Sequence, residues 1–176
     1  MNMEIKLRKL VATDIDDEYC NWYSNDDRHL QYFTGSGRLF SRNVLLEDFE
    51  TGKQSGTHFY YIIELVDGTR IGNVKIGPID MRNRTSDLVC FVGNRSFVGK
   101  GIASNAISLA NHIAFEAHDI RRLHSGMHAQ NIRSIKAYTK AGWFVEATMQ
   151  GYYLLDKVPS DRVCVACLNP KYFPTN

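Results

Sequence analysis

The sequence predicts a mixed α/β fold, with a twisted, mostly antiparallel sheet of about seven strands and four helices. Seven segments have the alternation or the β-branched and aromatic composition of strands: 4–11, 57–66, 69–76, 87–92, 121–129, 144–155 and 162–168. Two helices are expected before the second strand, one between the fourth and fifth strands, and one between the fifth and sixth. Three successive strands predict an antiparallel meander, and a strand-helix-strand unit predicts one parallel crossover.

The two helices in the N-terminal part are predicted from their capping residues. Thr13 can cap the first, with Asp16 at the capping-box distance, and this helix is expected to reach about residue 24. Ser41 can cap the second, which Gly52 is expected to end. The stretch 25–42 lacks periodicity, and we expect it to lie over the substrate side of the protein.

A strong hairpin signal lies in the middle of the chain. Asp67-Gly68 suits a two-residue turn, because such turns favour residues that tolerate positive φ, and it joins the second predicted strand to the third. Pro78 is expected to end the third strand, because proline cannot donate a hydrogen bond to its neighbour. The last two strands are expected to be joined by residues 156–161.

A glycine-rich loop, 93–101, precedes the third predicted helix, which spans 102–118. The first N–H groups of a helix have no internal partner and lie at the positive end of its dipole, so they can bind a phosphate group. Gly99 and Gly101 let an anion approach the backbone closely, and Lys100 adds a positive charge. We therefore expect a nucleotide-like or coenzyme diphosphate at this helix start.

Two common phosphate-loop patterns are not met. A P-loop has four residues between its glycines and Ser or Thr after its lysine, whereas five residues separate Gly93 from Gly99 and Gly101 follows Lys100. An NTPase is therefore rejected. The dinucleotide pattern G-x-G-x-x-G has Ser104 in place of its third glycine, and the loop follows at least three strands. A dinucleotide-binding oxidoreductase is therefore disfavoured.

The composition narrows the class of protein. The chain has 176 residues, 44% of them hydrophobic and 23% charged, which favours one folded domain over residues 1–176. The formal net charge is +2 and the basic residues are scattered, so neither nucleic acid nor an anionic membrane is expected as a partner. No secretory or transmembrane segment is visible, and we expect a reduced, cytoplasmic protein.

The sequence gives no reason to expect a metal site. Cys164 and Cys167 are three residues apart on a predicted strand, which places their side chains on opposite faces. His124 and His128 also fall on a predicted strand, and no second Cys or His pair follows at a ligand spacing. We expect the two cysteines to be small core residues.

The segment from Asn131 to Trp143 carries the pattern N-x-x-S-x-x-x-Y-x-K-x-G-W, about thirty residues after the glycine loop. Together with Gly99-Lys100-Gly101 it resembles the GNAT acyl-CoA N-acetyltransferases, whose pattern ends in Phe. Ser96 stands where that family has Gln or Arg ahead of its glycines. The resemblance covers roughly residues 7–168 and is closest to the branch of ribosomal-protein, spermidine and amino-sugar acetyltransferases.

The resemblance implies the GNAT fold, in which the fourth strand splays from the fifth and binds CoA. The residues that it assigns to acetyl-CoA, the co-substrate, are Phe91, Val92, Gly99, Lys100, Gly101, Ile102, Ala103, Ser104, Asn131 and Ser134. The helix start would hold the diphosphate. Backbone groups near Phe91 and Val92 would hold the pantetheine arm and polarise the thioester carbonyl.

Two residues are candidates for proton transfer. Tyr138 is expected to be neutral at pH 7, since the pKa of tyrosine is about 10, and it could protonate the departing thiolate of CoA. Asp87, at the start of the fourth predicted strand, is the candidate base, because burial could raise the pKa of its carboxyl. His124, His128 and a water relay are the alternatives for the base.

The sequence leaves the acceptor open. The main expectation is a primary amine of a small molecule, such as a nucleotide-linked amino sugar. The alternatives are a protein N-terminal acetyltransferase of the ribosomal-protein type and a non-catalytic acyl-CoA-binding sensor. Six aromatic residues could line the acceptor pocket or belong to the core: Tyr32, Phe33, Tyr60, Tyr61, Tyr152 and Tyr153. A homodimer is expected from the family alone.

Overall fold

The computed structural model describes residues 3–23, 30–33 and 40–174. Its strands are β1 (Ile5–Lys9), β2 (Phe59–Leu65), β3 (Arg70–Asp80), β4 (Thr85–Val92), β5 (Arg122–His128), β6 (Phe144–Leu155) and β7 (Val158–Leu168). Its helices are α1 (Asp17–Asn21), α2 (Arg42–Ser55), α3 (Ile102–Glu116) and α4 (Ile132–Lys140), with short 3-10 helices η1 (Ala12–Asp14) and η2 (Arg95–Phe97). The mixed α/β class is confirmed.

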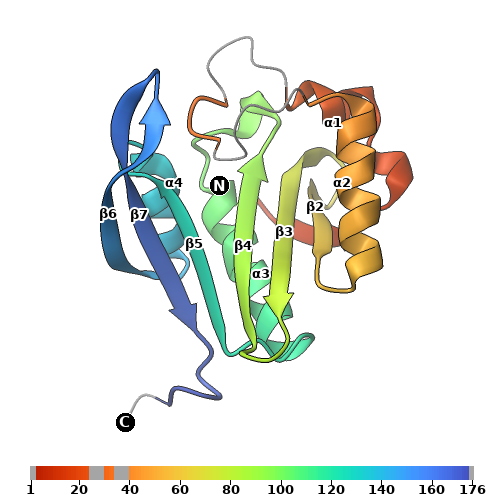
Figure 1. Ribbon diagram of the computed structural model, residues 1–176. Helices are drawn as coiled ribbons and strands as arrows, with labels where there is room; N and C mark the ends of the chain where they lie inside the picture. Colours follow the sequence, from red (N-terminus) through yellow and green to blue (C-terminus); the bar gives the residue numbers. More distant parts are fainter. Residues whose placement is uncertain (1–2, 24–29, 34–39, 175–176) are drawn as a thin grey trace.

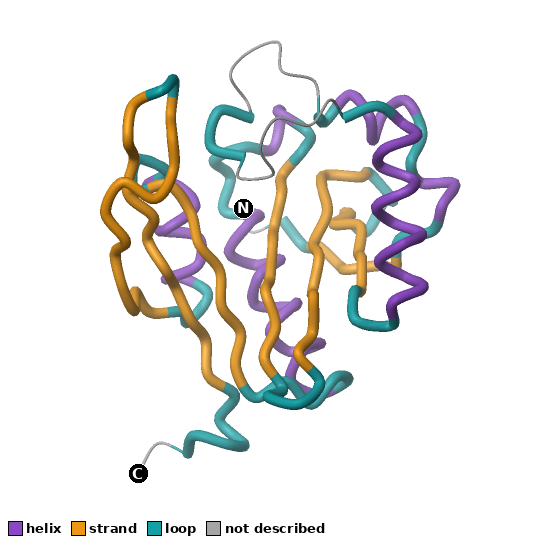
Figure 2. The backbone as a smooth tube through the Cα atoms, viewed as in Figure 1, coloured by secondary structure: helices purple, strands orange, loops and turns teal. Residues whose placement is uncertain are grey.

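The described strands form one sheet in the order β1-β2-β3-β4-β5-β7-β6 (Figure 1). Neighbours are antiparallel except β4 and β5, the predicted parallel crossover. β4 and β5 pair only at Thr85, Ser86 and Asp87 of β4, and beyond that point they diverge, as Figure 2 shows. The predicted splayed strand pair is therefore present.

Different helices cover the two faces of the sheet. α3 and α4 lie behind the sheet in Figure 1, and their apolar side chains form a core with Leu88 of β4 and Leu123 of β5. α1 and α2 pack on the opposite face, around Ile62 of β2. Because side chains alternate along a strand, burial of Leu88 in the α3 core turns its neighbour Asp87 toward the opposite face.

The N-terminal helices differ from their predicted boundaries. Asp16, not Thr13, caps α1, with its carboxylate accepting a hydrogen bond from the Tyr19 amide at 3.0 Å. α2 continues through Gly52 to Ser55 and is capped by Gly56, whose φ is 67°. A Cβ at Gly52 would lie 2.0 Å from the Tyr60 hydroxyl. This glycine therefore allows α2 to pack closely on β2, and it does not end the helix.

Three strand boundaries also differ. β3 continues past Pro78 to Asp80, because a register shift between Ile76 and Ile79 accommodates the proline. β4 begins at Thr85, so Asp87 is its third residue, not its first. The β6–β7 connection is shorter than 156–161, since strand pairing resumes at Val158. The prediction for 25–42 falls largely on 24–29 and 34–39, which lie outside the described residues.

Candidate active site

A groove of about 2120 Å³ crosses the sheet where β4 and β5 diverge. One flank comes from the start of α3 and from α4. The other comes from α1, from residues 30–33 and from the β6–β7 hairpin. The splay therefore connects the two faces of the sheet through one continuous space.

The start of α3 forms a part of this groove that suits an anion. Gly99 and Gly101 have φ values of 81° and 79°, and nothing lies within 4 Å of a Cβ built on either. Gly101 is the N-cap, and no side chain caps the helix. The amides of the first turn thus lack a capping partner in this structure, and no Cβ covers them. Backbone strain would oppose most side chains at either glycine.

The predicted residues of this turn contribute in different ways. Ile102, Ala103 and Ser104 line the groove, although the Ile102 side chain is buried in the core. Ser104 donates its hydroxyl to the Gly101 carbonyl at 2.8 Å, which leaves its backbone as the group available to a ligand. Lys100 is exposed outside the groove lining, with its Nζ 5.3 Å from the centre of the Phe97 ring.

Basic side chains on α4 were missed by the sequence reasoning. Arg133, Lys136 and Lys140 are exposed and line the groove. Their spacing of three and four residues places them on one helix face, and this signal was available in the sequence. Arg95 of η2 also lines the groove. These cations make the α3–α4 side of the groove favourable for phosphate groups.

Asn131 and Ser134 lie together at the start of α4. Asn131 is the N-cap, and its side-chain oxygen accepts a hydrogen bond from the Ser134 amide at 3.2 Å. Both residues line the groove. The structure therefore gives Asn131 a capping role through its side-chain oxygen.

Tyr138 reaches from α4 to the edge of β4 that β5 has left. Its hydroxyl donates a hydrogen bond to the Leu88 carbonyl at 2.7 Å, and its side chain borders the groove although it is almost fully buried. Burial raises the pKa of Tyr138 far above that of a free tyrosine, and nearby Cys90 adds to this effect. The hydroxyl therefore stays protonated in the free protein and donates a hydrogen bond, and the raised pKa makes it a weaker acid than a free tyrosine.

The backbone of β4 alternates between its two edges. The Leu88 carbonyl faces the open edge, where Tyr138 binds it, whereas a Cβ on Gly72 of β3 would lie 2.0 Å from the Phe91 carbonyl. By this alternation Cys90 and Val92 present their backbone groups to the open edge, and Phe91 presents its own to β3. Phe91 and Val92 both line the groove, and Cys90 is an additional candidate that the sequence reasoning did not include.

Asp87 lies at the last residue pair before the strands diverge, beside His124 of β5. It borders the groove on the face opposite α3. Burial raises the pKa of the Asp87 carboxyl, and this effect exceeds the lowering by His124, Lys75 and Arg162. A carboxylate with a raised pKa is a better proton acceptor than an ordinary aspartate.

The alternative base His128 already has a partner in the structure. Its Nδ1 lies 2.9 Å from the Ser160 hydroxyl, its ring is stacked on Tyr153, and burial lowers its pKa. His124 does not line the groove. Five of the six predicted aromatic residues border the groove, whereas Tyr61 is in the α3 core, so the pocket interpretation is wrong for Tyr61.

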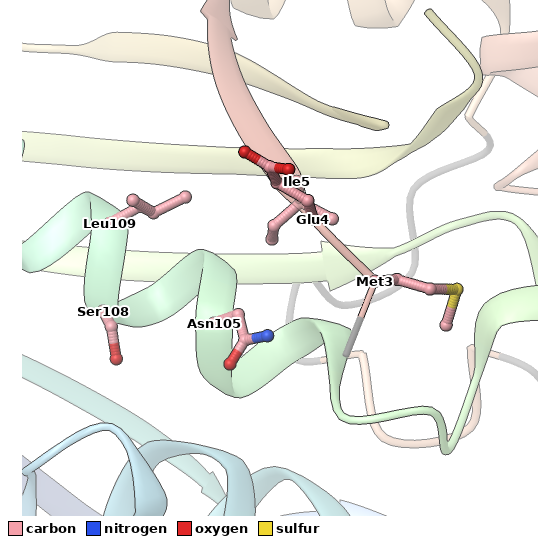
Figure 3. A pocket seen from close by; sticks show the side chains of 6 residues that line it. All are labelled: Met3, Glu4, Ile5, Asn105, Ser108 and Leu109. Carbon is pink, nitrogen blue, oxygen red and sulfur yellow. The ribbon is translucent and has the colours of Figure 1, made fainter. Parts of the chain in front are cut away.

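Outside the groove, a shallow depression of about 490 Å³ lies between β1 and α3, as Figure 3 shows. Its lining consists of Met3, Glu4, Ile5, Asn105, Ser108 and Leu109. Ser108 points away from Glu4 in that view, so the depression does not assemble reactive groups. Within the part of the chain that the structure describes, no three His, Cys, Asp or Glu side chains gather as metal ligands.

A model of the family described as acetyltransferase (GNAT) domain matches residues 4–143. The probable N-acetyltransferase YjcK of Bacillus subtilis is 24% identical over 174 residues, covering 94% of each chain. A Vibrio cholerae spermidine N-acetyltransferase solved with CoA and spermine has a TM-score of 0.84 at 18% identity, covering 96% of this chain and 98% of that one. Mycobacterium smegmatis RimJ, solved with CoA-disulfide, has a TM-score of 0.83 at 21% identity, covering 98% and 85%.

The fold and the matching family model are those of an acyltransferase. The chain belongs to the GNAT acetyltransferase family and is an acetyl-CoA-dependent N-acetyltransferase. The solved structures share its fold at low identity, so they leave its acceptor open. No described helix is long and apolar enough to cross a membrane.

Proposed function

We propose that this protein transfers an acetyl group from acetyl-CoA to a primary amine of a small molecule by direct attack. The observation that carries the proposal is the groove through the β4–β5 splay. It joins an uncapped helix start on one face to a half-buried carboxylate, Asp87, on the other, with Tyr138 at the strand edge between them.

The α3 side of the groove would hold the donor. Amides of the first turn of α3 and the open loop at Gly99 and Gly101 would bind the diphosphate, with Ser104 contributing its backbone. Lys100 would add charge from outside the lining. Asn131, Ser134 and the α4 cations would contact the remainder of the CoA moiety.

The open edge of β4 would hold the acetyl end. Pantetheine resembles a short stretch of peptide, so it can pair with the unpaired backbone of β4 where β5 has departed. A backbone N–H of Cys90 or Val92 would then donate to the oxyanion that forms when the amine attacks. Such a donor contributes about 3–4 kcal/mol to transition-state stabilisation in other acyl-transfer enzymes.

Two proton transfers complete the reaction. The attacking ammonium must lose a proton, and Asp87 would accept it directly or through water, because burial raises the pKa of this carboxyl. As the tetrahedral intermediate collapses, the C–S bond breaks and the thiolate takes a proton from Tyr138. Tyr138 would give up its hydrogen bond to Leu88 in that step and regain a proton from solvent.

The test is a thiol-release assay with acetyl-CoA and a panel of small amines, together with peptides that have free N-termini. We expect amine-dependent release of CoA and an acetylated small amine by mass spectrometry. Release with peptides alone would replace the small-molecule acceptor by a protein acceptor. Binding of acetyl-CoA without release on any acceptor would favour a non-catalytic acyl-CoA sensor.

A further inference from the structure

The acceptor side of the groove contains an arginine without an ionic partner. Arg162 of β7 lines the groove, and no described carboxylate lies within ion-pair distance of it. Its Nε is buried and has no hydrogen-bond partner. A buried N–H donor without a partner is uncommon in folded proteins, because the lost hydrogen bond with water is not replaced. Arg162 borders the groove, so a ligand there can gain a hydrogen bond from its guanidinium.

The guanidinium of Arg162 is held in place by its neighbours. A Cβ at Gly126 of β5 would lie 2.0 Å from Nε and 2.5 Å from a terminal nitrogen, so the planar group lies directly on this glycine. Its central carbon lies 4.9 Å from the centre of the Tyr152 ring. Gly126 and Tyr152 therefore fix the side chain between β5 and the β6–β7 hairpin.

Register places Arg162 on the same face as Asp87. Asp87 pairs with His124 on β5. His128 lies four residues further along β5 and pairs with Arg162 on β7. Paired residues point to the same face of a sheet, and so do residues two or four apart. The influence of Arg162 on the pKa of Asp87 agrees with this placement.

The charges on this side do not suit a polycation. Asp48 and Asp87 are the carboxylates among the described residues that line the groove. Burial already disfavours the charged form of Asp87 and raises the pKa of its carboxyl. Lys75 and Arg162 line the same face with positive charge. A polyamine would meet repulsion here, whereas an anionic group would gain a charge-assisted hydrogen bond.

We infer that Arg162 determines acceptor specificity by binding an oxyanion, a carboxylate or a phosphate, on the amine substrate. The amine would lie near Asp87 and the oxyanion at the guanidinium, which can bind two oxygens at once. This inference rests on the proposed function, since it concerns the acceptor of the same reaction. It assigns the acceptor to the class of anionic amines.

Matched acceptor pairs test the inference. Glucosamine 6-phosphate is compared with glucosamine, and β-alanine with its amide, by kcat/KM. The wild type should prefer the anionic member of at least one pair. Arg162→Gln should lower kcat/KM for that member roughly 10- to 100-fold, mainly through KM, and leave the neutral member nearly unchanged. Arg162→Lys should recover part of the loss, because it restores charge without the planar fork.

Two further variants sharpen the result. Gly126→Ala should reproduce the Arg162→Gln effect, because its Cβ displaces the guanidinium. Arg82→Gln removes an exposed arginine in the β3–β4 turn and should change neither member of a pair. A wild type that prefers neutral amines or spermidine would overturn the inference, as would an equal loss for both members in Arg162→Gln.

A binding measurement separates this inference from the proposed function. Inorganic phosphate is titrated by calorimetry into the complex with CoA, in which the diphosphate site is occupied. Binding that is lost in Arg162→Gln, without turnover on any amine, would support the oxyanion site and refute the transferase reaction. Turnover without preference for anions, and without phosphate binding, would refute the oxyanion site alone.

Discussion

At the scale of single residues, Tyr138 occupies the position that the proposed reaction needs for an acid. A hydroxyl on α4 that binds the Leu88 carbonyl stands at the point where the sheet opens. A tyrosine that served only the core would have a hydrogen-bond partner but no exposure to the groove. Tyr138 has the partner and also borders the groove. In the proposed reaction its position fits the departing sulfur better than the amine, because the amine would approach from the Asp87 face.

Removal of the Tyr138 hydroxyl tests the proposed acid. Tyr138→Phe should lower kcat by about 10²- to 10⁴-fold, the range for a lost general acid, with acetyl-CoA affinity little changed. Steady-state kinetics and calorimetry measure the two effects. Tyr172→Phe is the matched control, because it removes a hydroxyl bound to Asp119 away from the groove. Equal activity of Tyr138→Phe and wild type would refute the role.

The raised pKa of Asp87 predicts a pH dependence of activity. As the pH falls through this pKa, Asp87 becomes protonated and can no longer accept the proton of the amine. The kcat/KM profile should therefore have an acid limb above the ordinary aspartate pKa of about 3.9. Asp87→Asn should remove this limb and lower the plateau. A limb that persists unchanged in this variant would assign the titration to another group.

The same shift predicts an effect of Asp87 on stability. The folded protein binds the Asp87 proton more tightly than the unfolded chain, so this stabilisation is present at low pH and lost as pH rises through the folded pKa. Asp87→Asn should therefore be more stable than wild type at neutral pH, with the difference vanishing below about pH 4. Thermal unfolding across pH measures this, and a less stable variant at neutral pH would contradict it.

At the scale of elements, a network of charges ties β1 to the turn before α1. Arg8 donates to both oxygens of Asp14 at 2.9 Å and to Glu64 of β2 at 3.0 Å. Burial raises the pKa of Asp14, but hydrogen bonds from Arg8 and the Val11 amide outweigh it, so the pKa lies below its usual value. This network holds the chain on its path toward the groove.

Asp14 should therefore stabilise the fold above its unfolded pKa, and that contribution should disappear as pH falls through its lower folded pKa. Asp14→Asn should cost about 1–3 kcal/mol at pH 7, the range for a hydrogen bond to a charged group, and much less near about pH 2. Urea unfolding at both pH values measures the difference. Asp17→Asn is the control, since the Asp17 side chain is 98% exposed; an equal effect of both variants would argue against the network.

The elements also show which predictions a sequence permits. The helix starts of the proposed donor side were predictable because their signals are local: Gly99 and Gly101 precede α3, and Asn131 caps α4. The position of the Asp67-Gly68 turn was predictable for the same reason, but the loop spans Val66 to Thr69 and is longer than the predicted two residues. Helix ends were less predictable, since Gly52 stays inside α2 only because Tyr60 packs against it from β2.

At the scale of the whole molecule, the acceptor side shows why the remainder was missed. Arg162 lies on Gly126 only because β7 inserts between β5 and β6 with a particular register. No spacing within the chain connects these two residues. Asp87 could be proposed from its position in the sequence. The raised pKa of its carboxyl, however, depends on burial that outweighs the charges of His124, Lys75 and Arg162 on neighbouring strands. Local patterns predict the proposed donor site, whereas the proposed acceptor site depends on the register of the sheet.

The central claim is that acetyl-CoA binds at the start of α3, and calorimetry of acetyl-CoA with two matched variants tests it most directly. Gly99→Glu places a negative charge in the expected diphosphate site. Gly68→Glu is the control, because Gly68 has a similar φ of 88° and equally open surroundings in the β2–β3 turn. We expect wild type and Gly68→Glu to bind acetyl-CoA and Gly99→Glu to lose this binding. Equal affinity in all three proteins, or no binding to the wild type, would contradict it.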